Sequence, residues 1–172
     1  MKTNRINTNF FNFTYARDKD AVVASMLVCE MAASLKLAGK TILNALDALY
    51  ETYGFYLSYV QSIELTGADA MEKAAKMMAD LRSDVPATIG GAAVTGVRDY
   101  KISLAKDLVT GEQSTIDLPK SNVLELLLGE KGSVIARPSG TEPKVKFYYT
   151  AVGKAKEDTK ALLDKMVAQM SR

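Results

Sequence analysis

Histidine is absent from this chain of 172 residues, and cysteine occurs once. The first absence excludes acid–base catalysis by an imidazole and metal sites with histidine ligands. With one cysteine no disulfide can form within the chain, which fits a reducing cytoplasm, the expected location. Cys29 lies in an apolar helical pattern and is expected to be a buried rather than a reactive thiol.

Net charge and long apolar runs are also lacking. The 22 Lys and Arg residues nearly balance the 20 Asp and Glu residues, giving +2, and the basic residues are scattered. A nucleic-acid partner is therefore not expected. No run is long and apolar enough to cross a membrane, and residues 1–4 begin no signal peptide. The composition, 48% apolar and 24% charged, is typical of a soluble protein of one to two domains.

What the chain does contain is a distinctive loop, Arg137–Pro143, between two strand-like runs, Gly132–Ala136 and Lys144–Tyr149. Its arginine offers a planar fork of donors that matches a phosphate face, and its serine and threonine add hydroxyl donors. Its glycine has no Cβ to keep an anion from the backbone amides, and its two prolines restrict the backbone. The candidate phosphate ligands are Arg137, Ser139, Gly140, Thr141, Glu142 and Lys144.

A Ser-Gly-Thr sequence on its own is typical of a turn that joins two strands and binds no ligand. The complete loop with both flanking strands resembles the phosphate-binding loop in the last domain of the phosphoglucomutase/phosphomannomutase (α-D-phosphohexomutase) family. A second segment, Arg17–Val22 followed by Cys29–Ala33, resembles the part of that family just after its sugar-recognition loop. The resemblance extends over nearly all of the chain beyond about residue 14.

The resemblance implies a reversible shift of phosphate between the 1- and 6-positions of a hexose, through a glucose 1,6-bisphosphate-type intermediate and with Mg²⁺ in the parent enzyme. In that scheme the loop holds the phosphate that is not reacting, which fixes orientation at the distant centre. Arg137 is the expected bidentate ligand, with Ser139 and Thr141 as donors. Glu142 is expected to orient Arg137 or Lys144, or to accept a sugar hydroxyl.

Lys19 is the one catalytic candidate, because the family's equivalent lysine lies near the reacting phosphate. A surface ion pair with Asp18 or Asp20 explains it equally well. These two carboxylates alone make a poor metal site and are better explained as partners of a helix start.

The family's other parts are not found: a phosphorylated serine, an aspartate-rich metal loop and a sugar loop. Where the sugar loop is expected, residues 9–14 read Asn-Phe-Phe-Asn-Phe-Thr. The chain is therefore interpreted as a C-terminal fragment of a phosphohexomutase that binds no metal and has no turnover alone. Its expected partners are a hexose phosphate and the N-terminal domains of the parent enzyme. Whether glucose or mannose phosphates are preferred stays open.

Apolar periodicity predicts a helical hairpin, Asp20–Tyr53, left from a preceding α/β domain, so residues 1–54 form one domain and residues 55–172 the other. The second domain reads strand–helix–strand–strand–strand–helix, with a capping box at Asp69 and Glu72. That order predicts an α+β fold with a four-stranded, mostly antiparallel sheet and helices on one face, like the TATA-binding protein. The segment Asn122–Leu128 fits a helix or a strand.

Two other classes of function compete with phosphate binding. The hairpin exposes an apolar stripe and could make the chain a non-catalytic interaction module that self-associates. Similar sheets bind DNA elsewhere, but here basic and aromatic residues interleave only at Lys144, Lys146 and Tyr148. No nucleic acid and no membrane are expected as partners.

Overall fold

The computed structural model describes residues 21–170. The chain divides into two compact units, Met1–Leu49 and Tyr50–Arg172. Two of the predicted features, the candidate Lys19 and the acidic helix cap Asp20, lie outside the described residues.

The first unit contains helix α1 (Ala21–Leu37) and most of helix α2 (Ile42–Tyr53). Gly39, at a φ of +70°, follows α1 as a left-handed cap. Thr41 caps α2, because its Oγ1 accepts the Asn44 backbone N–H while Asn44 Oδ1 accepts the Thr41 backbone N–H.

Neither α1 nor α2 buries a residue, and most of their large apolar side chains are exposed. Cys29 is exposed as well, so the expected buried thiol is wrong, because α1 buries none of its residues. In the described part of the chain no single helix is long and apolar enough to cross a membrane. The pair α1–α2 meets that test only jointly. The two helices are bent by 90° at the break between them, so they do not run antiparallel as the expected hairpin would.

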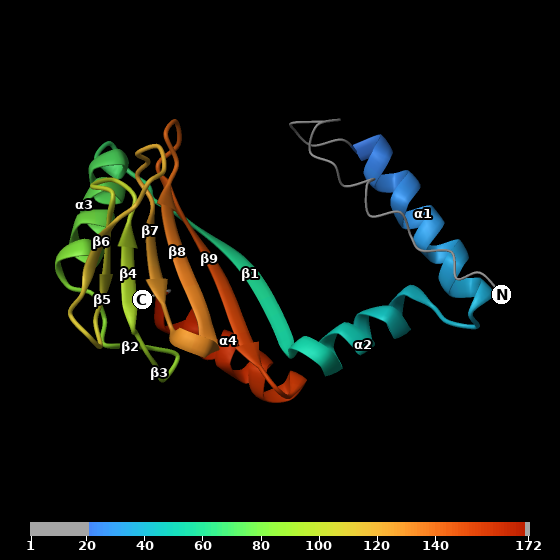
Figure 1. The fold of residues 1–172 in the computed structure, drawn as a ribbon. Coiled ribbons are helices and arrows are strands. Elements are labelled where there is room, and N and C mark those ends of the chain that lie inside the picture. The colour runs from blue at the N-terminus through green and yellow to red at the C-terminus, as the bar shows by residue number, and fades with distance from the viewer. Residues whose placement is uncertain (1–20, 171–172) are drawn as a thin grey trace. The chain divides into compact units, whose positions relative to one another are not determined.

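The second unit is built on a seven-stranded sheet in which every neighbouring pair is antiparallel. Its strands lie in the order β1-β9-β8-β7-β4-β5-β6 (Figure 1). The strands are β1 (Phe55–Glu64), β4 (Gly96–Asp99), β5 (Leu104–Asp107), β6 (Gln113–Thr115), β7 (Leu124–Leu127), β8 (Gly132–Pro138) and β9 (Lys144–Gly153). The short strands β2 (Thr88–Ile89) and β3 (Ala92–Ala93) form a separate pair, and a 3₁₀ turn, η2 (Gly129–Lys131), precedes β8.

The α+β class and the antiparallel pairing are confirmed, but the expected four strands are wrong. Between Gly90 and Leu104 alone the chain forms β3 and β4 and begins β5. Strands of two to four residues are too short to show an alternating pattern, because they carry one or two side chains per face. The segment that fitted either element forms β7, whose Leu124 and Leu126 are buried on the same face.

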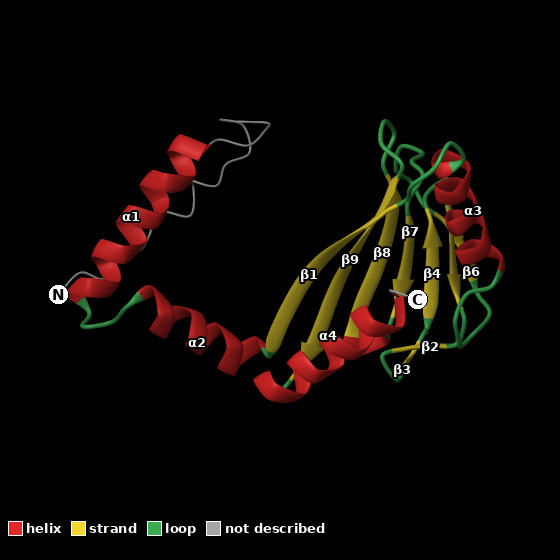
Figure 2. Ribbon diagram, turned by 180° about the vertical axis from the view of Figure 1, so that it is seen from behind, coloured by secondary structure: helices red, strands yellow, loops and turns green. Residues whose placement is uncertain are grey.

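Helices α3 (Ala70–Ser83) and α4 (Lys156–Met170) cover one face of this sheet (Figure 2). The core lies between them and the strands; its central residues are Met78, Met166, Val134, Val145, Phe147 and Tyr149. Tyr149 donates its hydroxyl to Gln61 Oε1 at 2.8 Å, which satisfies the one polar atom of a buried ring. The predicted capping box is not formed, since Asp69 makes no cap hydrogen bond and pairs instead with Lys73 at 2.9 Å.

Candidate phosphate-binding site

The 137–143 loop joins the two long central strands β8 and β9 at one end of the sheet (Figure 1). Arg137 and Pro138 are still part of β8, and Lys144 already belongs to β9. The Ser139 backbone N–H donates to the Lys144 carbonyl at 2.9 Å and closes the turn. The first and last predicted ligands are therefore held by the sheet, and only the residues between them rely on the turn itself.

The side chain of Ser139 organises that turn. Its Oγ accepts the backbone N–H groups of Glu142 at 3.2 Å and Thr141 at 3.4 Å. A serine that bonds backbone donors two and three residues on is a common device for fixing tight turns. Its hydroxyl hydrogen is left to donate to a ligand, so one side chain can shape the loop and contact an anion.

Glu142 lies against Lys144, with 2.6 Å between Oε2 and Nζ. This ion pair lowers the pKa of the Glu142 carboxyl and raises the pKa of the Lys144 ammonium. Of the two cations that Glu142 was expected to orient, the structure pairs it with Lys144. One charge of the loop is thus partly neutralised, while Glu142 itself stays exposed to solvent.

Gly140 is exposed, and a Cβ built on it meets no atom within 4 Å. Its backbone is also outside the left-handed region, so the turn does not require glycine for its own conformation. Close approach of a ligand to the backbone remains the predicted reason for this residue. Thr141, next to it, is exposed as well.

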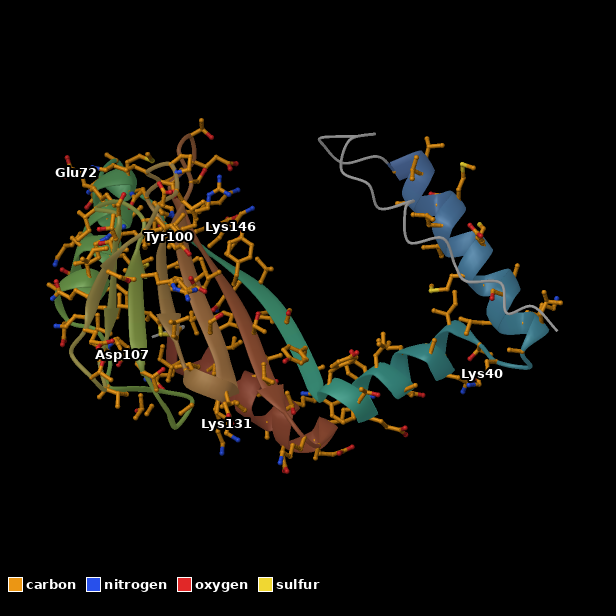
Figure 3. The ribbon with its side chains drawn as sticks, in the orientation of Figure 1. Lys40, Glu72, Tyr100, Asp107, Lys131 and Lys146 are labelled. Atoms are coloured by element: carbon orange, nitrogen blue, oxygen red, sulfur yellow. The ribbon has the colours of Figure 1, made fainter. Side chains whose placement is uncertain are left out.

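The structure adds Lys146, which was not among the predicted ligands. Lys146 is the direct cross-strand partner of Arg137, so both side chains leave the same face of the sheet, opposite to the core. Lys144 lies two positions earlier on that face. In Figure 3 Lys146 lies toward the end of the sheet that carries the loop. Among the described residues neither the Arg137 nor the Lys146 side chain has a hydrogen bond or an ion pair, although Glu142 interacts with Lys146 electrostatically. Two cations without a direct partner therefore face each other.

The signal for Lys146 was present in the sequence. Alternation along Lys144–Tyr149 already places Lys144 and Lys146 on one face. What was missing was the register between β8 and β9, which puts Arg137 opposite Lys146. A register shifted by one residue would have sent Lys146 to the other face relative to Arg137.

A metal site does not fit the described residues, since nowhere in residues 21–170 do three or more Asp, Glu or Cys side chains gather. A depression of about 1160 Å³ lies at the other end of the sheet. Its charged lining is mixed: Lys131, Lys154 and Lys165 alternate with Glu51, Glu130 and Asp158. In Figure 3 Lys131 lies at the end of the sheet away from Lys146. The loop end therefore has the stronger excess of positive charge.

The fold defines a two-layer α+β domain with a candidate anion-binding loop between β8 and β9. The family model of the phosphoglucomutase/phosphomannomutase C-terminal domain matches residues 68–169. The chain belongs to this family.

Among similar proteins is the phosphoglucomutase of Staphylococcus aureus strain MRSA252, 40% identical over 139 residues that cover 81% of this chain and 25% of the relative. The phosphoglucomutase of strain MSSA476 is 35% identical over 158 residues, covering 92% of this chain and 28% of the relative. The chain thus spans about a quarter of the length of these relatives.

The open form of pp63/parafusin, an exocytosis-sensitive phosphoprotein and phosphoglucomutase from Paramecium, is a similar solved structure. It superimposes with a TM-score of 0.58 at 14% sequence identity, over 89% of this chain and 26% of the other. This likeness supports the fold alone.

Proposed function

We propose that the 137–143 loop, together with Lys144 and Lys146, binds the phosphate of a hexose phosphate, as the C-terminal part of a phosphohexomutase. The observation that carries the proposal is that Arg137 and Lys146 face each other across β8 and β9 and that neither side chain has an ion-pair partner among the described residues. Like charges opposite each other destabilise a sheet unless an anion lies between them. A phosphate supplies that anion and accepts the fork of Arg137.

The turn supplies the rest of the site. Thr141 is exposed and Ser139 is half-buried, each with a hydroxyl that can donate to an anion, and Gly140 leaves its surroundings open to a ligand. Lys144 adds a positive charge that its ion pair with Glu142 partly neutralises. Within the longer enzyme this site holds the phosphate that is not reacting, and the Mg²⁺ of that enzyme is bound by other parts of it.

Calorimetric titration of the chain with inorganic phosphate tests the proposal. A charged bidentate contact contributes about 1.5–3 kcal/mol, so binding is expected to be millimolar at best and Arg137→Ala is expected to abolish it. Lys131→Ala, at the other end of the sheet, removes a cation of equal charge and serves as the control. Equal binding by the wild type and Arg137→Ala would contradict the assignment.

The 172 residues alone are proposed to be inactive as a mutase, because no serine with the family's nucleophile context was found among them and the described residues offer no metal cluster. A coupled assay for Mg²⁺-dependent conversion of glucose 1-phosphate to glucose 6-phosphate is expected to show no turnover. Turnover by the chain, purified from a host without phosphoglucomutase, would contradict this.

Self-association through the N-terminal helices is the second candidate. One observation favours it: α1 buries none of its residues, and its apolar side chains are widely exposed, Val22 at 71% and Leu37 at 92%. Exposed apolar area of this kind marks contact surfaces. Light scattering is expected to show dimers or larger species that Val22→Glu weakens, whereas a strict monomer at all concentrations would rule the candidate out.

A further inference from the structure

The face of the sheet opposite the helices carries an ordered pattern next to the phosphate site. On β9 the side chains of Lys144, Lys146, Tyr148 and Thr150 alternate with the buried Val145, Phe147, Tyr149 and Ala151, so the first set shares this open face. The registers with β1 and β8 extend the positions of Lys146, Tyr148 and Thr150 sideways into rows of three side chains, whereas Lys144 is paired with Glu64 of β1 alone. Each row can therefore be read directly from the strand pairing.

The first row is basic and contains Ser62, Lys146 and Arg137. The adjoining row is apolar: Val60 lies opposite Tyr148 on one side, and Ile135 lies opposite Tyr148 on the other. We call these three residues the platform. Val60 is 50% exposed, and Tyr148 and Ile135 are half-buried, so the platform is open to a ligand in this unit.

The third row carries hydroxyl groups, on Ser58, Thr150 and Ser133. With Ser62 in the basic row, the platform is bordered by hydroxyls on both sides. On the β7 side it ends at Glu125, which lies opposite Ile135. The Glu125 carboxylate already accepts the Tyr100 hydroxyl at 2.9 Å and an Arg98 N–H at 3.3 Å.

We propose that the platform of Val60, Tyr148 and Ile135 is a subsite for the sugar ring of the hexose phosphate whose phosphate lies at the Arg137–Lys146 pair. The inference rests on the proposed function and extends it from the phosphate to the rest of the ligand. Tyr148 presents an aromatic surface for the C–H groups of the ring, and the bordering serines and threonine offer hydroxyl partners.

The dimensions fit such a ligand. Residues i and i+2 on one face of a strand are about 6.6 Å apart, which is the spacing of Lys146 and Tyr148. This is the order of distance between the phosphorus of a hexose phosphate and the far side of its ring. Small-ligand sites combine apolar surface with a few placed polar groups, and the three rows have that composition.

The test compares two probes, glucose 1-phosphate and inorganic phosphate, each titrated calorimetrically into the full chain at matched ionic strength. The wild type is expected to bind glucose 1-phosphate more tightly than phosphate. Tyr148→Val retains a strand-forming side chain but removes the ring. It is expected to weaken glucose 1-phosphate binding by about three- to tenfold and to leave phosphate binding within about twofold.

Two variants serve as controls. Tyr148→Phe keeps the ring and is expected to retain the affinity for glucose 1-phosphate. Tyr56→Val removes a tyrosine from the same face of β1, where Tyr56 is 54% exposed and lies opposite Val152, away from the platform. It is expected to change neither affinity.

A measurement on the wild type tests the platform even if Tyr148→Val fails to fold. In methyl NMR spectra glucose 1-phosphate is expected to shift the signals of Val60 and Ile135, and inorganic phosphate is expected to leave them in place.

The possible failures are distinguishable. Equal losses for both probes in Tyr148→Val, no loss for either, or no preference for glucose 1-phosphate in the wild type would each overturn the platform subsite and leave the phosphate site standing. If Arg137→Ala binds both probes like the wild type, or the wild type binds neither, the proposed function itself fails.

Discussion

Arg137 and Lys146 stand directly opposite each other on β8 and β9, on the open face of the sheet, and neither has an ion-pair partner among the described residues. An opposed pair of like charges costs stability on the order of a few tenths of a kcal/mol in a sheet. Such a cost is characteristic of residues placed for a ligand, because binding sites are where local rules are broken. Removing one of the two charges is therefore expected to raise the stability of the fold and to weaken phosphate binding.

Lys146→Thr is expected to raise the free energy of unfolding by about 0.3 kcal/mol at low salt, because it removes the repulsion and inserts a strand former. It is also expected to weaken phosphate binding by about tenfold. Urea unfolding at low and high salt and calorimetry measure the two effects, with Lys131→Thr as the control. A variant that is clearly less stable and binds phosphate normally would show that Lys146 is structural.

Ser139→Ala removes the acceptor for the backbone N–H groups of Thr141 and Glu142. It is expected to lower stability by about 0.5–1 kcal/mol and to weaken phosphate binding, since the turn loses its shape as well as a donor. Thr141→Val is the matched comparison: its exposed hydroxyl supports no part of the turn, so stability is expected to stay within about 0.5 kcal/mol while binding falls. Equal loss of stability in both variants would contradict these separate roles.

Two glycines of the β8 region are expected to respond in opposite ways to alanine. Gly132 has a φ of +120°, and a Cβ there would overlap the carbonyl oxygen of Thr150 on β9. Gly132→Ala is therefore expected to lower stability by about 3 kcal/mol or more. Gly140→Ala meets nothing within the chain and is expected to fold normally but to bind phosphate less well. Thermal unfolding and phosphate titration distinguish the two; normal phosphate binding by Gly140→Ala would remove that residue from the site.

The ion pair with Lys144 lowers the pKa of Glu142 from its ordinary value. A lowered pKa in the folded state means that the carboxylate stabilises the fold above the pKa of the unfolded chain, and that this contribution is lost as the pH falls through the folded-state value. Because Glu142 is exposed, the effect on stability is expected to be small. Lys144→Met is expected to return the Glu142 pKa toward its ordinary value in an NMR titration, whereas Lys160→Met, which breaks the exposed pair with Asp164, leaves it unchanged. Identical titration of Glu142 in all three proteins would show that the pair does not form in solution.

The long elements could be predicted from the sequence because their patterns are strong. The ten residues of β9 alternate cleanly, and α1 and α2 are bounded by Gly39, Thr41 and Gly54. The candidate ligands of the loop were predicted from residue chemistry and family resemblance, and their role stays a prediction. The short strands β5 and β6 were missed, because their pairing depends on neighbours rather than on local pattern.

Tertiary context decided the other differences. Asp69 fits a capping box, but Lys73, one turn further along α3, competes for its carboxylate. Lys146 joined the site only once its register with Arg137 was known. Sequence patterns report what a residue favours locally, whereas these outcomes depend on which residue stands across from it.

The most direct test of the central claim is a two-dimensional NMR titration of the uniformly labelled chain with inorganic phosphate. The account predicts that the largest shifts occur at the backbone amides of residues 139–142 and 144 and at the Arg137 Nε–H. Shifts centred on Lys131, Lys154 and Lys165 at the opposite end, with the 137–143 loop unaffected, would contradict it.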